Sequence, residues 1–292
     1  PNLCAAVKRH GAKLMLMNGR LSEKSYRGYG KLPRLIRPMM ARFDALAVQT
    51  QVEAERYMAL GAWPERVYPI GSVKFDMTLD TAVKQAASQL RVSFGDRPVW
   101  IAASTHPGED APVLAAHKTL RAQKPDALLI LVPRHPERFD GVADQVREAG
   151  LSVARRSQQE PAADAAVYLA DTMGELLMLF GACDVAFVGG SLVPVGGHNL
   201  LEPAAWEKPV LTGPHLHNFT AIAQLLDEAG GLSVVDSGEA LGDKLQALMS
   251  DPDQCARQGQ AAAAVVEANR GALEKGLELI AMEMNVGLRP SG

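Results

Sequence analysis

Residues 184–203 read "DVAFVGGSLVPVGGHNLLEP", and this stretch decides the fold class of the chain. The apolar run 185–188 shows no polar–apolar alternation, which is typical of a strand buried on both faces of a parallel sheet. Two glycine pairs follow, and the pattern becomes helical after Asn199. A strand, a flexible loop and a helix start in this order predict one unit of a doubly wound α/β domain.

The alternation of apolar strands and amphipathic helices extends in both directions from this stretch. A break at 93–98, "SFGDRP", separates a first Rossmann-like domain at 1–92, expected to be incomplete, from a second at 93–271. A last helix lies within 272–292, and its return to the first domain is left open. The strands are expected at 13–17, 45–49, 67–70, 99–103, 128–132, 152–154, 166–169, 185–188, 209–211 and 232–235.

The composition, with 47% hydrophobic and 22% charged residues among 292, is that of a globular protein without an apolar run of membrane-spanning length. Three cysteines without metal-ligand spacing favour a reducing compartment. A net charge of -3 hides a basic segment, 8–42, with ten lysines and arginines against Glu23 alone. This segment suits a nucleotide, a phosphorylated lipid or a membrane surface, and a solvated helix face is the alternative. The acidic, aromatic-poor remainder argues against nucleic acid.

Polar side chains follow four strands of the second domain directly. Since parallel strands present their carboxyl ends at one edge of the sheet, we expect these side chains to meet there and to bind a phosphorylated ligand. The four segments are Ser104 to His106, Pro133 with Arg134, 172–175 ("TMGE"), and the stretch from Gly189 to Glu202.

Asn199 and Glu202 have the spacing of a capping box, in which both side chains satisfy the N–H groups of a helix start. A helix cap requires only one flexible residue before it, however, whereas four glycines precede the expected helix start at Asn199. Gly190 and Gly197 therefore become candidates for close backbone approach to a ligand, and the Glu202 carboxylate could accept two ribose hydroxyls. Thr172 and Glu175 repeat the capping spacing, with a phosphate at the helix start as the functional alternative.

Several cationic side chains have two interpretations each. Arg134 is suited to a phosphate or a base edge, with an ion pair to Glu137 as the alternative, and Arg138 is expected at the surface. Lys74 could stabilise a departing phosphate, or pair with Asp76. Arg20 follows the first strand and could meet an anionic acceptor.

The remaining candidate residues are of types that also occur commonly outside functional sites. Ser104, Thr105 and His106 could be ordinary helix caps, or they could contact a ligand at the edge of the sheet. His198, His215 and His217 lack the spacing and the carboxylates of a metal site, so no metal is expected.

Four motifs together resemble the 3-deoxy-D-manno-octulosonic acid (Kdo) transferase family: "IGSVKFD", "ILVPRHPERF", "DTMGELLMLFGACDVAFVGG" and "FVGGSLVPVGGHNLLEPAAWEKPVLTGPH". The resemblance implies a GT-B glycosyltransferase with two Rossmann-like domains. It implies transfer of Kdo from CMP-Kdo to the lipid A precursor (lipid IVA) in lipopolysaccharide biosynthesis, on the cytoplasmic side of the inner membrane. It implies no metal and no cofactor, since CMP-Kdo is a substrate.

The resemblance also assigns residues. Lys74 matches a transition-state stabiliser, and the general-base glutamate of the family is expected in a segment before Pro1. Two alternatives remain: another GT-B nucleotide-sugar enzyme, or a part that binds CMP without turnover. The CMP contacts of the family fall on Pro133, Arg134, Met173, Gly174, Glu175, Asn199, Leu200, Leu201 and Glu202.

Overall fold

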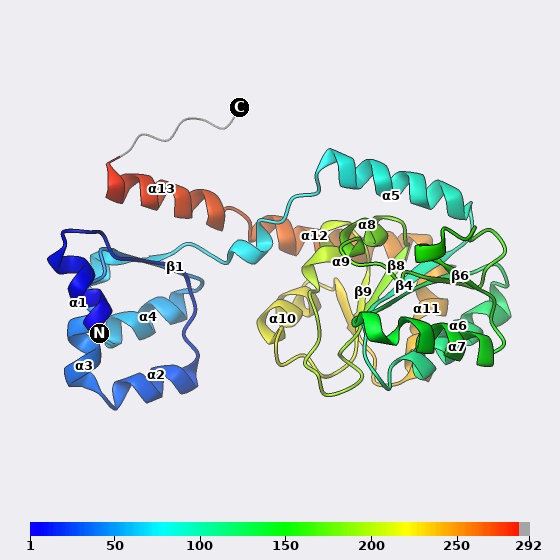
Figure 1. The fold of residues 1–292 in the computed structure, drawn as a ribbon, viewed down its shortest axis with the longest axis horizontal. Coiled ribbons are helices and arrows are strands. Elements are labelled where there is room, and N and C mark those ends of the chain that lie inside the picture. Colours follow the sequence, from blue (N-terminus) through cyan, green and yellow to red (C-terminus); the bar gives the residue numbers. More distant parts are fainter. Residues whose placement is uncertain (286–292) are drawn as a thin grey trace. The chain divides into compact units, whose positions relative to one another are not determined.

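The computed structural model describes residues 1–285, which divide into two compact units (Figure 1). Unit 1 consists of residues 1–77 together with the segment from Glu267 onward, and unit 2 is Thr78–Val266. The first division therefore lies at 77/78 rather than at the expected 92/93. The reason is α5 (Thr81–Phe94), whose Leu90 and Phe94 pack into the core of unit 2.

Unit 1 is built on a parallel three-stranded sheet in the order β1-β2-β3. The central strand β2 alternates its side chains between two covered faces. Leu46 and Val48 pack with residues of α3 and α4, whereas Ala45 and Ala47 pack with Leu279 of α13. The elements are α1 (Asn2–Arg9), β1 (Met15–Gly19), α2 (Glu23–Gly30), α3 (Pro33–Met40), β2 (Ala45–Val48), α4 (Gln51–Ala59), η1 (Pro64–Arg66), β3 (Val67–Pro69), η2 (Val73–Phe75) and α13 (Ala272–Met284).

Unit 2 contains a parallel seven-stranded sheet in the order β10-β9-β8-β4-β5-β7-β6. The chain starts at β4 in the middle, runs outward through β5, and returns to β8 on the other side of β4. The crevice between β4 and β8 is thus the topological switch point, where open α/β sheets bind ligands. The strands are β4 (Val99–Thr105), β5 (Leu128–Pro133), β6 (Val153–Arg155), β7 (Val167–Leu169), β8 (Val185–Val188), β9 (Val210–Thr212) and β10 (Leu232–Val234).

Helices cover both faces of this sheet, which explains why its strands are apolar throughout. Trp100 and Phe187 face α6, α7 and α11, whereas Ile101 and Ile130 face α5 and α8. The remaining elements are α6 (Asp110–Gln123), η3 (Pro136–Arg138), α7 (Phe139–Glu148), η4 (Arg156–Gln158), α8 (Leu176–Gly181), α9 (Leu201–Ala205), α10 (Thr220–Glu228), α11 (Gly238–Ser250) and α12 (Pro252–Ala268).

The ten expected strands are all present, with ends displaced by at most two residues. The prediction of parallel α/β sheets is confirmed. Within residues 1–285, no helix combines the length and apolarity that a membrane span requires.

Candidate functional site

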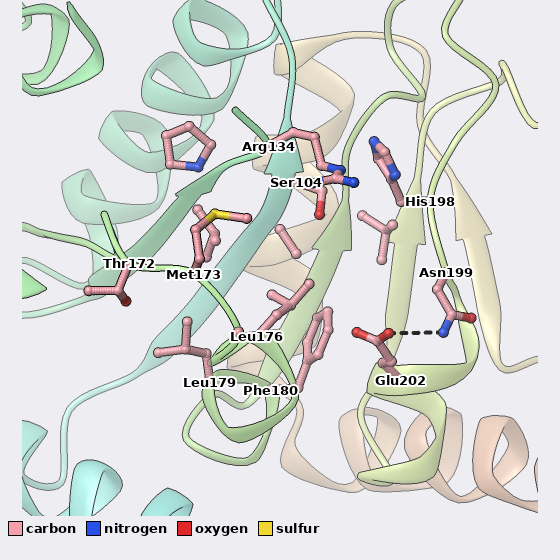
Figure 2. Close-up of a pocket in the computed structure, with 15 residues that line it drawn as sticks. Ser104, Arg134, Thr172, Met173, Leu176, Leu179, Phe180, His198, Asn199 and Glu202 are labelled. Carbon is pink, nitrogen blue, oxygen red and sulfur yellow. Dashed lines mark hydrogen bonds between the residues drawn. The ribbon is translucent and has the colours of Figure 1, made fainter. Parts of the chain in front are cut away.

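A pocket of about 300 Å³ opens at the switch point of unit 2 (Figure 2). All its walls come from unit 2: the ends of β4, β5 and β8, the loop before α8 with its first turns, and the start of α9. The lining residues are Ala103, Ser104, Val132, Pro133, Arg134, Thr172, Met173, Gly174, Leu176, Leu179, Phe180, Val188, His198, Asn199 and Glu202. Eight of the predicted site residues are among them: Ser104, Pro133, Arg134, Met173, Gly174, His198, Asn199 and Glu202.

Glu202 points into the pocket near Phe180, and Asn199 donates to its carboxylate over 3.0 Å (Figure 2). Burial raises the pKa of Glu202, and the bond from Asn199 offsets part of that effect. The predicted capping box is wrong in detail. Helix α9 begins at Leu201, whose N–H is accepted by Asn199 Oδ1 at 3.1 Å, so the Glu202 carboxylate faces the pocket instead of a backbone N–H.

The loop before α8 presents Met173 and Gly174 to the pocket but turns Glu175 away from it. Arg156 binds the Glu175 carboxylate at 2.8 Å, and the Thr172 hydroxyl donates to it as well. The hydrogen bond from Arg156 lowers the pKa of Glu175. Since α8 begins only at Leu176, the second predicted capping box is absent. Glu175 therefore anchors the loop that carries two lining residues.

Ser104 lies at the end of β4 with a φ of 58°, a conformation that residues with a side chain rarely adopt. A buried network holds the next residue: Thr105 donates to Asp110 over 2.8 Å, and Arg138 donates to Asp110 and to the Thr105 carbonyl. Arg138 was expected at the surface, but its side chain is only 14% exposed. The structure corrects this, because the guanidinium ties the ends of β4 and η3 together. Thr105 itself is fully buried and does not belong to the pocket lining.

The segment with the two glycine pairs, residues 189–200 between β8 and α9, is called the glycine loop, and a buried carboxylate of the chain binds it. Glu109, fully buried, accepts backbone N–H groups from His106, Gly190, Ser191 and Leu192 at 2.7–3.0 Å. The N–H of Gly190 therefore points at Glu109, although we expected this glycine to approach a ligand. Glu109 was not among the predicted site residues, since "STHPGED" shows only that an acidic residue precedes a helix.

The other predicted residues lie outside the pocket lining. Leu200 and Leu201 are fully buried, and Gly190 and Gly197 adopt positive φ angles in the loop between β8 and α9. Arg20 and Lys74 belong to unit 1, where Arg20 is exposed and Lys74 lies in η2.

The carboxylate that follows η2 fastens α13 to the rest of unit 1. Asp76 accepts the N–H groups of Gly271 and Leu273 at 2.5 and 2.6 Å, at the start of α13. Among residues 1–285, no three histidine, cysteine or carboxylate side chains cluster as a metal site requires.

Two Rossmann-like parallel sheets, with a pocket at the switch point of the second, are the architecture of the GT-B class of glycosyltransferases. Solved structures agree with this class. The C-terminal CMP-Kdo binding domain of WaaA from Acinetobacter baumannii matches with a TM-score of 0.62 and 33% identity, over 64% of this chain and 99% of that domain. MnaA of S. aureus, solved with UDP, shares the fold over 99% of this chain at 17% identity and a TM-score of 0.59.

Sequence comparison then gives the family. The family model described as 3-deoxy-D-manno-octulosonic-acid transferase (kdotransferase) matches residues 1–77. The 3-deoxy-D-manno-octulosonic acid transferase of Haemophilus influenzae is 40% identical over 98% of this chain, and that of Bordetella pertussis 38% over 96%. The chain spans 68% and 66% of the lengths of these relatives. It belongs to the Kdo transferase family of glycosyltransferases, which confirms the resemblance found in the sequence.

Proposed function

We propose that the chain binds CMP-Kdo in the pocket of unit 2 and transfers Kdo to the lipid A precursor, lipid IVA, in lipopolysaccharide biosynthesis. One observation carries the proposal: Arg134, Met173 and Glu202, which come from three separate segments of the sequence, line one pocket of about 300 Å³. Membership of the Kdo transferase family and the likeness to a CMP-Kdo binding domain support it.

The pocket suggests an orientation for the nucleotide. Glu202, with Asn199 beside it, is suited to accept the ribose hydroxyls. Arg134 and Ser104 lie together at the opposite end, where a guanidinium and a hydroxyl can bind the phosphate (Figure 2). The base then lies against Pro133, Met173 and Gly174, and Leu176, Leu179 and Phe180 form the apolar floor.

The proposed chemistry is a direct displacement at the anomeric carbon of Kdo. A hydroxyl of the acceptor attacks this carbon after losing its proton to a carboxylate, and CMP leaves with the bonding electron pair. The charge on the departing phosphate is met by Arg134 and, in this proposal, by Lys74 of unit 1. The reaction then requires neither a metal ion nor a cofactor from the protein.

The basic segment of unit 1 is proposed to receive the acceptor on the cytoplasmic face of the inner membrane. At the start of α3, Leu32 and Leu35 are 56% and 48% exposed beside Lys31 and Arg34. Exposed apolar side chains among cations suit a surface of anionic headgroups and the phosphates of the acceptor. Arg20 is the residue we propose at the acceptor phosphate.

Calorimetric titration of CMP, with UDP as the comparison, tests the donor assignment. CMP is expected to bind more tightly than UDP, because the site is proposed for one phosphate and a cytosine edge. Equal or tighter binding of UDP would favour another GT-B nucleotide-sugar enzyme. Binding of CMP together with failure to transfer Kdo from CMP-Kdo to lipid IVA would leave a nucleotide-binding part that does not turn over.

Two variants test the residues, each with a matched control. Arg134→Ala and Glu202→Ala should each weaken CMP binding by about 1.5–3 kcal/mol, the usual loss for a hydrogen bond to a charged group. Arg147→Ala and Glu137→Ala remove exposed charges outside the pocket and should bind CMP like the unaltered chain. Undiminished affinity in both pocket variants would overturn the site.

A further inference from the structure

Three histidine rings lie together where the pocket meets Arg134. His198 lines the pocket, and its Nε2 is 2.8 Å from Nε2 of His106. The two rings are stacked at 11° with centroids 5.0 Å apart, and His135 meets His106 edge-on at 5.2 Å. The nucleotide contacts proposed above use none of these rings.

The 2.8 Å bond fixes how many protons the His106–His198 pair can hold. A neutral imidazole has one N–H, so one ring donates and the other accepts. One more proton can enter at Nδ1 of the donating ring, which turns the contact into a charge-assisted hydrogen bond without breaking it. A second added proton would place two N–H groups on one axis and separate the rings. The pair therefore titrates as a unit that gains a single proton.

The surroundings keep that proton away while the pocket is empty. Burial, followed by the neighbouring His106 and Arg134, lowers the pKa of His198 to about 4, and burial lowers the pKa of His106 as well. Arg138 and His135 also oppose the added charge, whereas Glu109 favours it. Glu202 is the other titrating group of the lining, and Asn199 donates to it.

We propose that the His106–His198 pair is a proton-gated anion subsite, which takes one proton from solvent when the singly charged phosphodiester of a cytidine nucleotide enters the pocket. The inference rests on the proposed function. His198, Arg134 and Ser104 lie at the same end of the pocket (Figure 2). A negative charge about 4–6 Å from an imidazole raises its pKa by between about 1 and 3. The added positive charge therefore forms beside Arg134 only when an anion is there to offset it.

The sign of the pH dependence follows. The pair has a lower pKa in the free chain than in the complex, so binding takes up protons at a pH between the two values. Affinity for the anion should rise as the pH falls from 8.5 to 6. It should level off once the pH is low enough for the pair in the free chain to be protonated as well.

The experiment uses the methyl ester of CMP, a phosphodiester that does not titrate near neutral pH. Calorimetric titration into the chain, in buffers of different ionisation enthalpy, gives the number of protons taken up per ligand bound. We expect about 0.5–0.9 proton at pH 6.0 and nearly none at pH 8.5, with affinity about two- to tenfold higher at pH 6.0. Cytidine, which lacks the phosphate, reports the contribution of Glu202 and should show no such uptake.

Variants assign the proton to the pair. His106→Gln with His198→Gln should abolish the uptake, whereas His135→Gln, which changes the third ring alone, should preserve it. The unaltered chain offers a second measurement that does not depend on folding of a variant. The ring nitrogens of His106 and His198 should move toward imidazolium positions in nitrogen-15 spectra when the ester binds at pH 6.0. Those of His117, buried in the core, should not.

The outcomes separate the two proposals. If the ester binds without proton uptake, or if the double variant takes up as many protons as the unaltered chain, the proton-gated subsite is overturned and the nucleotide site stands. If neither CMP nor its methyl ester binds, the proposed function fails and the subsite fails with it.

Discussion

Glu109 Oε2 accepts the N–H of Gly190 at 2.7 Å, across 81 residues of sequence. The same carboxylate accepts three further backbone N–H groups, so a buried carboxylate of the chain itself binds the start of the glycine loop. The loop is thereby ordered before any ligand arrives, and its other end carries His198 and Asn199 into the pocket.

Glu109→Gln should destabilise the chain and weaken CMP binding together. The amide group would turn an N–H donor toward two backbone donors, at a cost of about 3 kcal/mol or more from lost charge-assisted bonds. Urea unfolding measures the stability, and calorimetry measures the affinity, which we expect to fall about tenfold as the loop loosens. The exposed Glu137→Gln serves as the control. A variant of unchanged stability would mean that other groups order the loop.

His117 should make the stability of unit 2 depend on pH. Trp100 Nε1 donates to His117 Nδ1 at 3.0 Å, so the ring is neutral and its Nε2–H donates to the Ala166 carbonyl at 2.8 Å. Burial lowers the pKa of His117 to about 4, against about 6.5 in an unfolded chain. The unfolded chain alone therefore gains the proton between these values, and the free energy of unfolding should fall by about 3 kcal/mol from pH 6.5 to pH 4.

Comparing variants isolates this contribution, because other groups titrate in the same range. His117→Gln should have lower stability at neutral pH and a flatter pH profile than the unaltered chain. His217→Gln, at an exposed position, should leave the profile unchanged. Parallel profiles for the unaltered chain and His117→Gln would show that His117 does not titrate on unfolding.

Two glycines inside helices should respond in opposite directions to alanine. A Cβ at Gly259 in α12 would collide with the Glu207 carbonyl oxygen, whereas a Cβ at Gly141 in α7 meets nothing within 4 Å. Gly259→Ala should destabilise by about 1–3 kcal/mol through overpacking, and Gly141→Ala should stabilise by about 0.5–1 kcal/mol through helix propensity. Thermal unfolding of both variants measures the difference. If both alanine variants were more stable than the unaltered chain, Gly259 in α12 would not be packed closely against the Glu207 carbonyl.

Asp76→Asn should loosen the start of α13. The carboxylate binds the N–H groups of Gly271 and Leu273, and its replacement by a neutral amide removes both the charge and one acceptor. We expect a loss of about 1–2 kcal/mol, as for other helix caps. Hydrogen exchange should accelerate at the amides of α13 and stay unchanged in β4 of unit 2. If amide hydrogen exchange accelerated equally in both units, the effect of Asp76 would not be confined to the start of α13.

The fold and the lining of the pocket could be predicted because both follow from local patterns. Apolar runs located the strands, and parallel strands place the residues that follow them at one edge. The buried polar network could not be predicted in the same way. Arg138 and Glu109 are charged residue types that usually lie at the surface. Contacts with segments distant in sequence, Asp110 and the glycine loop, leave the Arg138 side chain only 14% exposed and bury Glu109 fully.

The capping motifs failed for a related reason. Two residues with the spacing of a capping box do not by themselves determine at which residue the helix begins. Contacts with residues distant in sequence determine where the two glutamate side chains point. Arg156 takes Glu175 away from the helix end, and the pocket leaves Glu202 facing open space. Lys74 and Arg20 remain predictions, since their proposed partners are substrates.

Every residue that lines the pocket of unit 2 lies between Ala103 and Glu202. Under the proposed function, the contacts of this pocket with the donor therefore come from a single uninterrupted stretch of the chain, residues 103–202. Recombination that exchanges this stretch between related genes would move the whole nucleotide preference at once, while leaving acceptor choice to the recipient. An inhibitor shaped to this pocket would likewise have its resistance mutations confined to that same stretch.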